Sequence, residues 1–461
     1  MIFQNPLTDY FSFYIIHNLN KYSIFIELLF NLVILSIQAK GKKMESYYTA
    51  SIDNNLSFEK LSEDVQADIC IIGGGFTGIS SALHLAKSGF KVVVLEAHQP
   101  GYGASGRNGG HVGIGQRVDQ FYLEKTFGLA KAKTLWDMSV EAVETVKSLI
   151  KNYSIDCDLK YGNIHFAHKK SLCNELREEA DHLTNNYNFS GRYLSKQELS
   201  EYIGTDIFFG ALMDDQSCHL HPLKYLHGLV LAAKNAGVEI YGDSKVMDYT
   251  NHPTLVRTDC GSVRSDHIII ACNGYIENLE PRINGYIMPI NNFVIATEQL
   301  SNDIAKSLVP KDTSMSDSRF VINYWKLSGD NRLIFGGGET YTTKFPRDIK
   351  NFVKKYMLKI YPQLSDTKVE YGWGGTLAIT LNRLPHFGKL ADNIWYMQGY
   401  SGHGIAASTH AGKLVSEAIS GDSARFEIMA NLPTVKFPGG TLLRWPGMVA
   451  GMLYYTLRDR F

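Results

Sequence analysis

The segment 68–96 is the part of this chain that most limits what it can fold into. It begins with a short apolar run typical of a buried parallel strand, and Gly73, Gly75 and Gly78 follow at G-x-G-x-x-G spacing. A helical stretch and a second apolar strand come next, and that strand ends at Glu96. This order predicts a strand, turn, helix and strand that bind an adenine dinucleotide.

Each residue of this motif has a physical role in such a unit. Gly73 permits a tight turn, Gly75 lets backbone amides approach a pyrophosphate, and Gly78 lets the helix lie close to the strand. Glu96 lies where a carboxylate accepts hydrogen bonds from ribose hydroxyls, which disfavours a 2′-phosphate. The unit alone leaves open whether the dinucleotide carries a nicotinamide or a flavin.

A second glycine-rich segment, HQPGYGASGRNGGHVGIG at 98–115, is too rich in glycine for a helix or strand and too long for a simple connection. We expect it to wrap a ligand, with Ser105 and Arg107 adding a hydroxyl and a positive fork for phosphate. A surface loop is the alternative. From Ala130 to Tyr153, apolar residues recur at helical spacing and predict an amphipathic helix.

Charge and cysteine content exclude several classes of protein. Lys plus Arg and Asp plus Glu both total 46, so no basic surface for nucleic acid is indicated. The six cysteines form neither a C-x-x-C pair nor a cluster at zinc spacing. We therefore expect reduced thiols in a cytoplasmic chain and no metal site.

The N-terminal extension, residues 1–43, differs in character from the rest of the chain. Residues 22–37 are nearly continuous apolar residues followed by lysines, and a signal peptide has its positive charge before the apolar stretch. Interrupted by Glu27 and Asn31, the stretch is short for a membrane span. Two interpretations stay open: a mis-assigned start upstream of Met44, or a membrane anchor.

The G-x-G-x-x-G unit followed by GASGRNGG resembles the FAD-dependent glycine and D-amino-acid oxidase family. Ser265 to Tyr275, Arg332 to Gly338 and Asn393 to Ala406 resemble further segments of that family. The resemblance implies a Rossmann-like FAD-binding domain with a doubly wound, mainly parallel α/β sheet, and an interleaved α+β substrate domain with an antiparallel sheet. The expected ranges are 65–161, 215–275 and 369–420 for the FAD-binding domain, 162–214 and 276–368 for the substrate domain, and 421–461 for a C-terminal tail with a hydrophobic helix.

The resemblance also implies how FAD is held. No cysteine lies near Trp373 to form a thioether, so we expect non-covalent FAD, with the flavin ring at the loop before a helix that begins near Ile405. His403 and Tyr400 are candidate catalytic residues, each with simple packing as the alternative. The expected cofactor contacts are Gly73, Gly75, Phe76, Thr77, Gly78, Glu96, Ala104, Ser105, Arg107, Asn108, Gly109, Gly110, Val246, Ala271, Gly399, Ser401, Gly402, His403, Gly404 and Ile405.

Other motifs resemble the subgroup of this family that oxidises γ-glutamylputrescine. They are YYTASI after Met44, GASGRNGGHVGIG, WGGTLAITLNRLPHFG from Trp373, GYSGHG, and the tail from Leu443. Leu377 stands where glycine oxidases of the family have an arginine for the substrate carboxylate, and Arg383 is a candidate to bind a more distant carboxylate.

The resemblance implies oxidation of an amine to an imine, which water hydrolyses to an aldehyde, with dioxygen reduced to hydrogen peroxide. The alternatives are a D-amino-acid, glycine or sarcosine oxidase of the same fold, or a dehydrogenase that passes electrons to a quinone. The apolar N-terminal segment and tail keep membrane contact as an option for an otherwise cytoplasmic enzyme.

Overall fold

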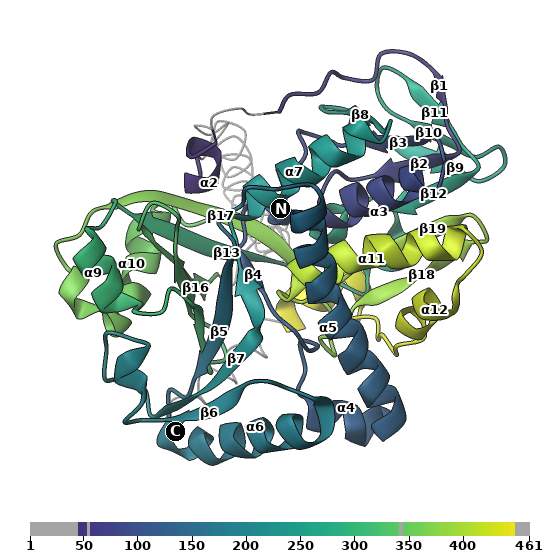
Figure 1. Ribbon diagram of the computed structural model, residues 1–461. Coiled ribbons are helices and arrows are strands. Elements are labelled where there is room, and N and C mark those ends of the chain that lie inside the picture. Colours follow the sequence, from purple (N-terminus) through teal and green to yellow (C-terminus); the bar gives the residue numbers. More distant parts are fainter. Residues whose placement is uncertain (1–44, 53–55, 341–343, 448–461) are drawn as a thin grey trace, which may run out of the picture. The chain divides into compact units, whose positions relative to one another are not determined.

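Two large β-sheets and one small sheet organise the structure (Figure 1). The computed structural model describes residues 45–52, 56–340 and 344–447. The predicted N-terminal extension and the last part of the predicted tail, 448–461, therefore lie outside the described residues. Residues 440–447, within the predicted tail, are helical.

The first large sheet has six strands and contains the predicted dinucleotide-binding unit. Every neighbouring pair is parallel except the antiparallel pair at the edge formed by β18 and β19. The strand order is β18 (His386–Ala391), β19 (Ile394–Gln398), β12 (His267–Ile270), β2 (Ile69–Ile72), β3 (Val92–Leu95) and β8 (Glu239–Tyr241). The two strands predicted around the glycine-rich turn are confirmed.

Both faces of this sheet are covered, which explains why its strands are apolar throughout. Ile69 and Ile71 face the core formed with the helices, while Cys70 and Ile72 face a second apolar cluster on the other side. The first face packs against helices α3 (Phe76–Lys87), α5 (Leu129–Asn152), α7 (Pro222–Asn235) and α11 (Gly404–Ile419). The second face packs against the small sheet of β1 (Val65–Gln66), β11 (Ser262–Arg264), β10 (Leu255–Arg257) and β9 (Asp248–Thr250).

The second large sheet has nine strands in the described part of the chain and is antiparallel apart from the pairing of β14 with β5. Its centre is an aromatic core in which Phe166, Trp325 and Phe335 stack. The order is β17 (Val369–Ile379), β13 (Met288–Thr297), β16 (Leu333–Glu339), β15 (Tyr324–Leu327), β14 (Ser314–Asp317), β5 (Lys160–Phe166), β7 (Gly210–His219) and β4 (His111–Val112), with β6 (Arg192–Ser195) beside β7.

One predicted boundary needs correction. The range 369–420 was assigned to the FAD-binding domain, but β17 pairs along its length with β13 in the nine-stranded sheet, and only the turn after it returns the chain to the six-stranded sheet. The boundaries at 161 and 215 likewise fall inside β5 and β7. A strand's sheet depends on a distant pairing partner, which local sequence does not reveal.

The remaining helices lie around these sheets. The predicted amphipathic helix is confirmed as α5, with its apolar stripe buried. The other described α-helices are α2 (Tyr47–Ala50), α4 (Gln120–Phe127), α6 (Cys173–Tyr187), α8 (Pro281–Asn284), α9 (Asn302–Leu308), α10 (Ile349–Ile360) and α12 (Ala424–Ala430). The 3-10 turns are η1 (Ala104–Gly106), η2 (Lys170–Leu172), η3 (Leu199–Glu201), η4 (Asn273–Tyr275) and η5 (Pro362–Leu364). None of the helices described is long and apolar enough to cross a membrane.

Candidate functional site

The glycine-rich turn between β2 and α3 has the geometry of a phosphate cradle. Gly73 has a φ of +113°, and a Cβ there would lie 2.8 Å from the carbonyl oxygen of Ala271. A Cβ on Gly75 would lie 2.9 Å from Ser105 Oγ, and one on Gly78 would overlap the carbonyl oxygen of Gly73. The tight turn at Gly73 and the close helix–strand approach at Gly78 therefore require glycine as predicted, and the approach of a pyrophosphate to Gly75 stays a prediction.

Glu96 lies at the end of β3, beside this turn. Its Oε2 accepts a hydrogen bond of 2.7 Å from the Gly74 N–H, and its Oε1 accepts one of 3.0 Å from the His98 N–H. Burial raises the pKa of the carboxyl group, and the two N–H donors partly offset this effect. Because a carboxylate accepts several hydrogen bonds, Glu96 can still accept hydrogen bonds from ribose hydroxyls.

The loop 98–115 folds over the start of α3. Ser105 Oγ accepts a 3.0 Å hydrogen bond from the Phe76 N–H, which places its hydroxyl at the N-terminus of the helix. Asn108 fastens the loop to itself: its amide donates to the carbonyls of Ala104 and Ser105, both at 3.0 Å, and accepts from Gly110 N–H at 2.8 Å. The loop is therefore held by its own side chains rather than being a loose surface segment.

Arg107 connects the loop to the nine-stranded sheet. Its Nε donates to the Tyr102 carbonyl at 2.6 Å, its Nη1 donates to the Gly374 carbonyl at 3.3 Å, and the guanidinium lies over the Tyr102 ring. In return, the Trp373 indole Nε1–H donates to the Arg107 carbonyl at 2.9 Å. The predicted role of Arg107 as a phosphate-binding fork stays a prediction, because these bonds occupy part of the guanidinium.

The segment 399–405 brings the start of α11 to the same region. Ser401 fastens it to the end of β17, where its N–H donates to the Ala378 carbonyl at 2.9 Å. A Cβ on Gly402 would meet nothing within 4 Å, and α11 has no side-chain cap at its N-terminus. Open space beside free helix amides suits the electron-rich edge of a flavin.

The two candidate catalytic residues are both buried, and both form hydrogen bonds within the protein. The Tyr400 hydroxyl shares a 2.7 Å hydrogen bond with the Thr77 hydroxyl, and burial raises the pKa of the tyrosine. His403 Nε2 donates to the Gly113 carbonyl at 3.1 Å. Burial, together with the charge of Arg117, lowers the pKa of His403 to about 4, so the imidazole is neutral. These contacts favour the packing alternative, and a catalytic role for either residue stays a prediction.

The other predicted site residues lie in different parts of the structure. Ala271 lies at the end of β12 against Gly73, and Val246 is buried in the apolar cluster on the outer face of the six-stranded sheet. Leu377 packs against an apolar cluster on β13 and β17. Arg383 lies in the turn between β17 and β18 with a φ of +64°. Its proposed contact with a substrate carboxylate stays a prediction.

The residues present fit FAD. Three segments distant in sequence, 73–78, 104–110 and 399–405, are joined by the contacts of Ser105 with Phe76 and of Tyr400 with Thr77. At the start of α3 the Phe76 N–H is already bonded to Ser105, whereas α11 has no side-chain cap and can offer its first amides to a negatively charged group. The glycine cradle would hold the pyrophosphate, Glu96 the ribose, and the start of α11 the flavin.

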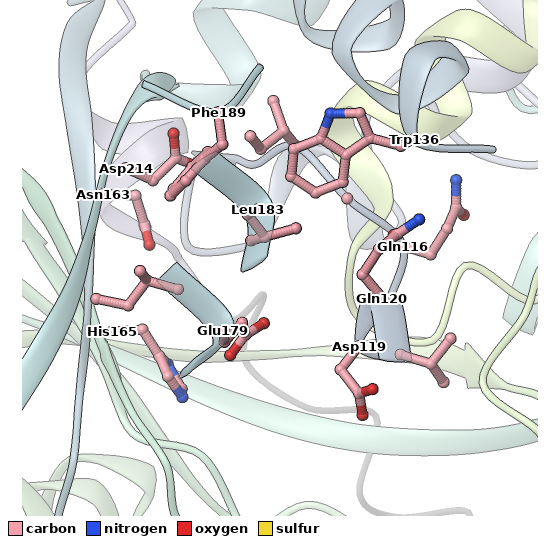
Figure 2. Close-up of a pocket in the computed structure, with 14 residues that line it drawn as sticks. Gln116, Asp119, Gln120, Trp136, Asn163, His165, Glu179, Leu183, Phe189 and Asp214 are labelled. Atoms are coloured by element: carbon pink, nitrogen blue, oxygen red, sulfur yellow. The ribbon is translucent and has the colours of Figure 1, made fainter. Parts of the chain in front are cut away.

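A cavity of about 140 Å³ lies next to the loop, between the nine-stranded sheet and helices α5 and α6 (Figure 2). In Figure 2, the aromatic rings of Trp136 and Phe189 occupy one end, and Glu179 lies between His165 and Asp119 at the other. The remaining lining residues are Ile114, Gly115, Gln116, Val118, Gln120, Asn163, Leu183, Leu212 and Asp214.

This cavity directly adjoins the predicted cofactor loop. Asn163, on its wall, is 3.4 Å from the His111 ring, and His111 follows Gly110 in the loop. The loop residues beyond His111 are fixed by side chains of the neighbouring elements, with Ile114 N–H bonded to Ser217 and Gly115 N–H bonded to Ser139. One continuous segment thus passes from the cofactor site to the cavity wall.

The cavity is acidic at one end. Burial and the neighbouring carboxylate of Asp119 raise the pKa of Glu179 to about 7. Burial lowers the pKa of His165 to about 4, so this imidazole is neutral and adds no positive charge. Arg117 lies near His165 and His403, since its charge also lowers the pKa of both groups. The cavity lining therefore presents the carboxylates of Glu179 and Asp119.

Several of these residues were missed from the sequence. Glu179, Asp119 and His165 belong to no motif, and they converge only in the folded chain. Lys326 was also missed: it is 2% exposed, and burial lowers its pKa to about 8. It lies behind the cofactor loop, where a Cβ on Gly110 would be 2.9 Å from its Cε. A single lysine inside an apolar strand was the only available signal.

Comparisons with known proteins agree with this geometry. A family model described as DAO, FAD dependent oxidoreductase, matches residues 68–418. The chain is 40% identical over 417 residues to the gamma-glutamylputrescine oxidoreductase of Escherichia coli (strain K12), covering 90% of this chain and 98% of that protein. It is 37% identical over 432 residues to the probable oxidoreductase OrdL of Haemophilus influenzae, covering 92% and 99% respectively.

The fold is also shared with solved structures. The crystal structure of glycine oxidase from Geobacillus kaustophilus superposes with a TM-score of 0.67 at 19% identity, covering 80% of this chain and all of that chain. At this identity the likeness concerns the fold, and it confirms the predicted combination of a Rossmann-like domain with an antiparallel-sheet domain.

Proposed function

Because the chain belongs to the family of FAD-dependent oxidoreductases and FAD is its cofactor, we propose that it oxidises the terminal amine of γ-glutamylputrescine or a closely related aminoalkyl compound. The amine loses two electrons and two protons to give an imine, which water hydrolyses to an aldehyde and ammonia. Dioxygen takes the electrons and protons and leaves as hydrogen peroxide. Similarity to the Escherichia coli enzyme over most of both chains supports this substrate class.

The acidic cavity is the observation that carries this proposal. A volume of about 140 Å³ corresponds to about five water-sized groups at ~30 Å³ each, enough for one end of an extended substrate. Glu179 is a carboxylate whose ionisation is opposed by burial and by Asp119, so a cationic ligand would relieve an unfavourable charge. An ammonium group is the ligand that this end of the cavity fits best.

The head of γ-glutamylputrescine carries both an ammonium and a carboxylate on its α-carbon. We assign the α-ammonium to Glu179, with Asp119 close by, and Arg383 stays the candidate for the α-carboxylate. This assignment adds Glu179 to the residues that were predicted from the sequence. It agrees with Leu377 in place of a carboxylate-binding arginine, since the reacting end of this substrate has no carboxylate.

When bound, FAD accepts the hydride equivalent from the carbon beside the reacting nitrogen. The protein must hold that nitrogen uncharged and exclude competing water. Burial lowers the pKa of His111 to about 3 and that of His403 to about 4, so neither imidazole places a positive charge on the cofactor loop. Trp136 and Phe189 shield the cavity with apolar surface.

Two further features belong to the proposal. All six cysteines are free thiols, and no cysteine lies near Trp373, which supports non-covalent FAD and a cytoplasmic location. Acid precipitation should release the flavin into the supernatant, and flavin retained in the pellet would contradict non-covalent binding.

Anaerobic bleaching of the flavin spectrum tests the substrate. A panel of γ-glutamylputrescine, N-acetylputrescine, putrescine, sarcosine, glycine and D-alanine should give the fastest reduction with γ-glutamylputrescine. Fastest reduction by sarcosine or D-alanine would refute the assignment and favour the amino-acid oxidase alternative. Admission of air then tests the acceptor: rapid reoxidation with peroxide supports an oxidase, and slow reoxidation that a quinone accelerates supports a dehydrogenase.

A further inference from the structure

The segment Ser46–Ser51, named the N-terminal clamp here, is buried far more deeply than an early chain segment usually is. It contains α2, which a capping box between Ser46 and Thr49 begins. Tyr47 is 5% exposed and Tyr48 is fully buried. Two tyrosines in one helical turn thus face the interior, and their partners show what the segment holds.

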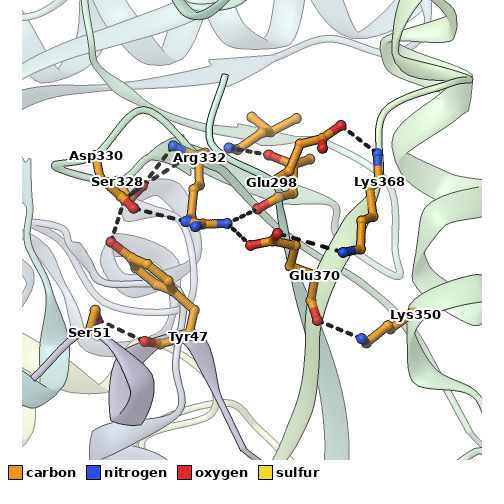
Figure 3. A network of polar contacts seen from close by, with 11 residues as sticks. Tyr47, Ser51, Glu298, Ser328, Asp330, Arg332, Lys350, Lys368 and Glu370 are labelled. Atoms are coloured by element: carbon orange, nitrogen blue, oxygen red, sulfur yellow. Dashed lines mark hydrogen bonds and ion pairs between the residues drawn. The ribbon is translucent and has the colours of Figure 1, made fainter. Parts of the chain in front are cut away.

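On one side, the clamp is fixed to the nine-stranded sheet (Figure 3). The Tyr47 hydroxyl donates to Asp330 at 2.5 Å, and Arg332 Nε donates to the same carboxylate at 2.8 Å. The Arg332 guanidinium lies between two rings, 5.7 Å from the centre of Tyr47 and 5.5 Å from that of Tyr371. A partly buried, charge-assisted and stacked contact of this kind fixes a short segment firmly.

On the other side, the clamp contacts the start of α7. Ser51 Oγ is 2.9 Å from His221 Nε2, and the Tyr48 ring packs edge-on against His221 with centroids 4.7 Å apart. His221 caps α7 by accepting a hydrogen bond from Lys224 N–H. The first turn of α7 supports the cofactor loop, because a Cβ on Gly101 or Gly106 would meet the Leu223 side chain.

Tyr48 also reaches the cofactor loop by a second route. Its ring packs edge-on against Trp373 with centroids 5.2 Å apart. Trp373 in turn donates its Nε1–H to the Arg107 carbonyl at 2.9 Å. The clamp therefore contacts both supports of the loop 98–115: α7 through His221, and β17 through Trp373.

We infer that the N-terminal clamp positions the cofactor loop for FAD, with Tyr48 and Trp373 as the positioning residues. The clamp joins the helix under one side of the loop to the strand under the other, so its loss lets the two supports move apart. The inference requires FAD as the cofactor and is independent of which amine is oxidised. It also gives the YYTASI motif a physical role.

The first test compares two conservative tryptophan variants in the full chain. W373F removes the hydrogen bond to Arg107 and keeps an aromatic ring, whereas W325F removes an equally buried indole whose Nε1–H donates to Tyr361 in the aromatic core. Deflavinated protein is titrated with FAD by flavin fluorescence. Loss of one hydrogen bond, about 1 kcal/mol, should raise the Kd of W373F about fivefold, while W325F keeps the wild-type Kd. Equal Kd values for all three proteins would overturn the inference.

The second test compares Tyr48 with Tyr361, which is also fully buried but lies away from the loop. Y48A should weaken FAD binding by more than tenfold, and Y48F should restore it, because the Tyr48 hydroxyl has no hydrogen-bond partner in the described structure. Y361A should lower the melting temperature comparably and leave FAD affinity unchanged. If Y361A weakens FAD binding as much as Y48A, the effect is general destabilisation and the positioning role is refuted.

Discussion

Replacing Glu179 by glutamine tests the substrate assignment most directly. The change preserves shape and hydrogen bonding but removes the charge at the acidic end of the cavity. A charge-assisted hydrogen bond at a partly buried site contributes about 1.5–2 kcal/mol, which corresponds to about 10- to 30-fold. We therefore expect kcat/KM for γ-glutamylputrescine to fall by about that factor.

The assay uses a ratio of two substrates. N-acetylputrescine has the same reacting amine but lacks the α-ammonium and α-carboxylate, so effects on the reacting end cancel in the ratio of the two kcat/KM values. The matched control is E178Q, which removes an exposed charge from the neighbouring position of α6. E179Q should lower the ratio about 10- to 30-fold, and E178Q should leave it unchanged.

The pH dependence of the same ratio tests the reasoning further. With a pKa of about 7, Glu179 is about 3% ionised at pH 5.5 and about three-quarters ionised at pH 7.5. Because the protonated form keeps a ratio only about 10- to 30-fold lower, the wild-type ratio should rise about 6- to 12-fold over this range, and the E179Q ratio should stay flat. A wild-type ratio that is independent of pH, or an E179Q ratio equal to that of wild type, would refute the assignment of the α-ammonium to Glu179.

Three other predictions concern the cofactor site and the fold. G78A should raise the Kd for FAD more than about 100-fold, because its Cβ would overlap the Gly73 carbonyl. The flavin absorbance of the purified protein measures how much FAD remains bound. E96Q should raise the Kd for FAD about tenfold in fluorescence titration, because a charged acceptor for the ribose is lost. Burial lowers the pKa of Lys326 from 10.5 to about 8. Between pH 8 and pH 10.5 the lysine is therefore more protonated in the unfolded chain than in the folded one, and the free energy of unfolding rises with pH. In denaturant unfolding, K326M should be more stable than wild type at pH 7, and a persistent advantage above pH 10.5 would contradict this cause.

Much of the cofactor site was predictable because its signals are local. Gly73 requires glycine for its own positive φ and Gly78 for its contact with the Gly73 carbonyl, both within one strand, turn and helix unit, so spacing identifies the turn. The placement of β17 was not predictable in this way, since it depends on pairing with β13, far away in the sequence. Periodicity shows which face of a strand is buried but not which sheet receives it.

The cavity shows the same limit for single residues. Glu178 and Glu179 are adjacent acids on α6. Glu178 is exposed, whereas the pKa of Glu179 is raised by burial and by Asp119, and nothing in the local sequence distinguishes the two. The distinction arises only where α6, β5 and the segment after the cofactor loop converge. That segment is continuous with the loop, and His403 is bonded to it at Gly113. On the proposed assignment, the substrate head group and FAD would therefore both contact one continuous segment, residues 98–120.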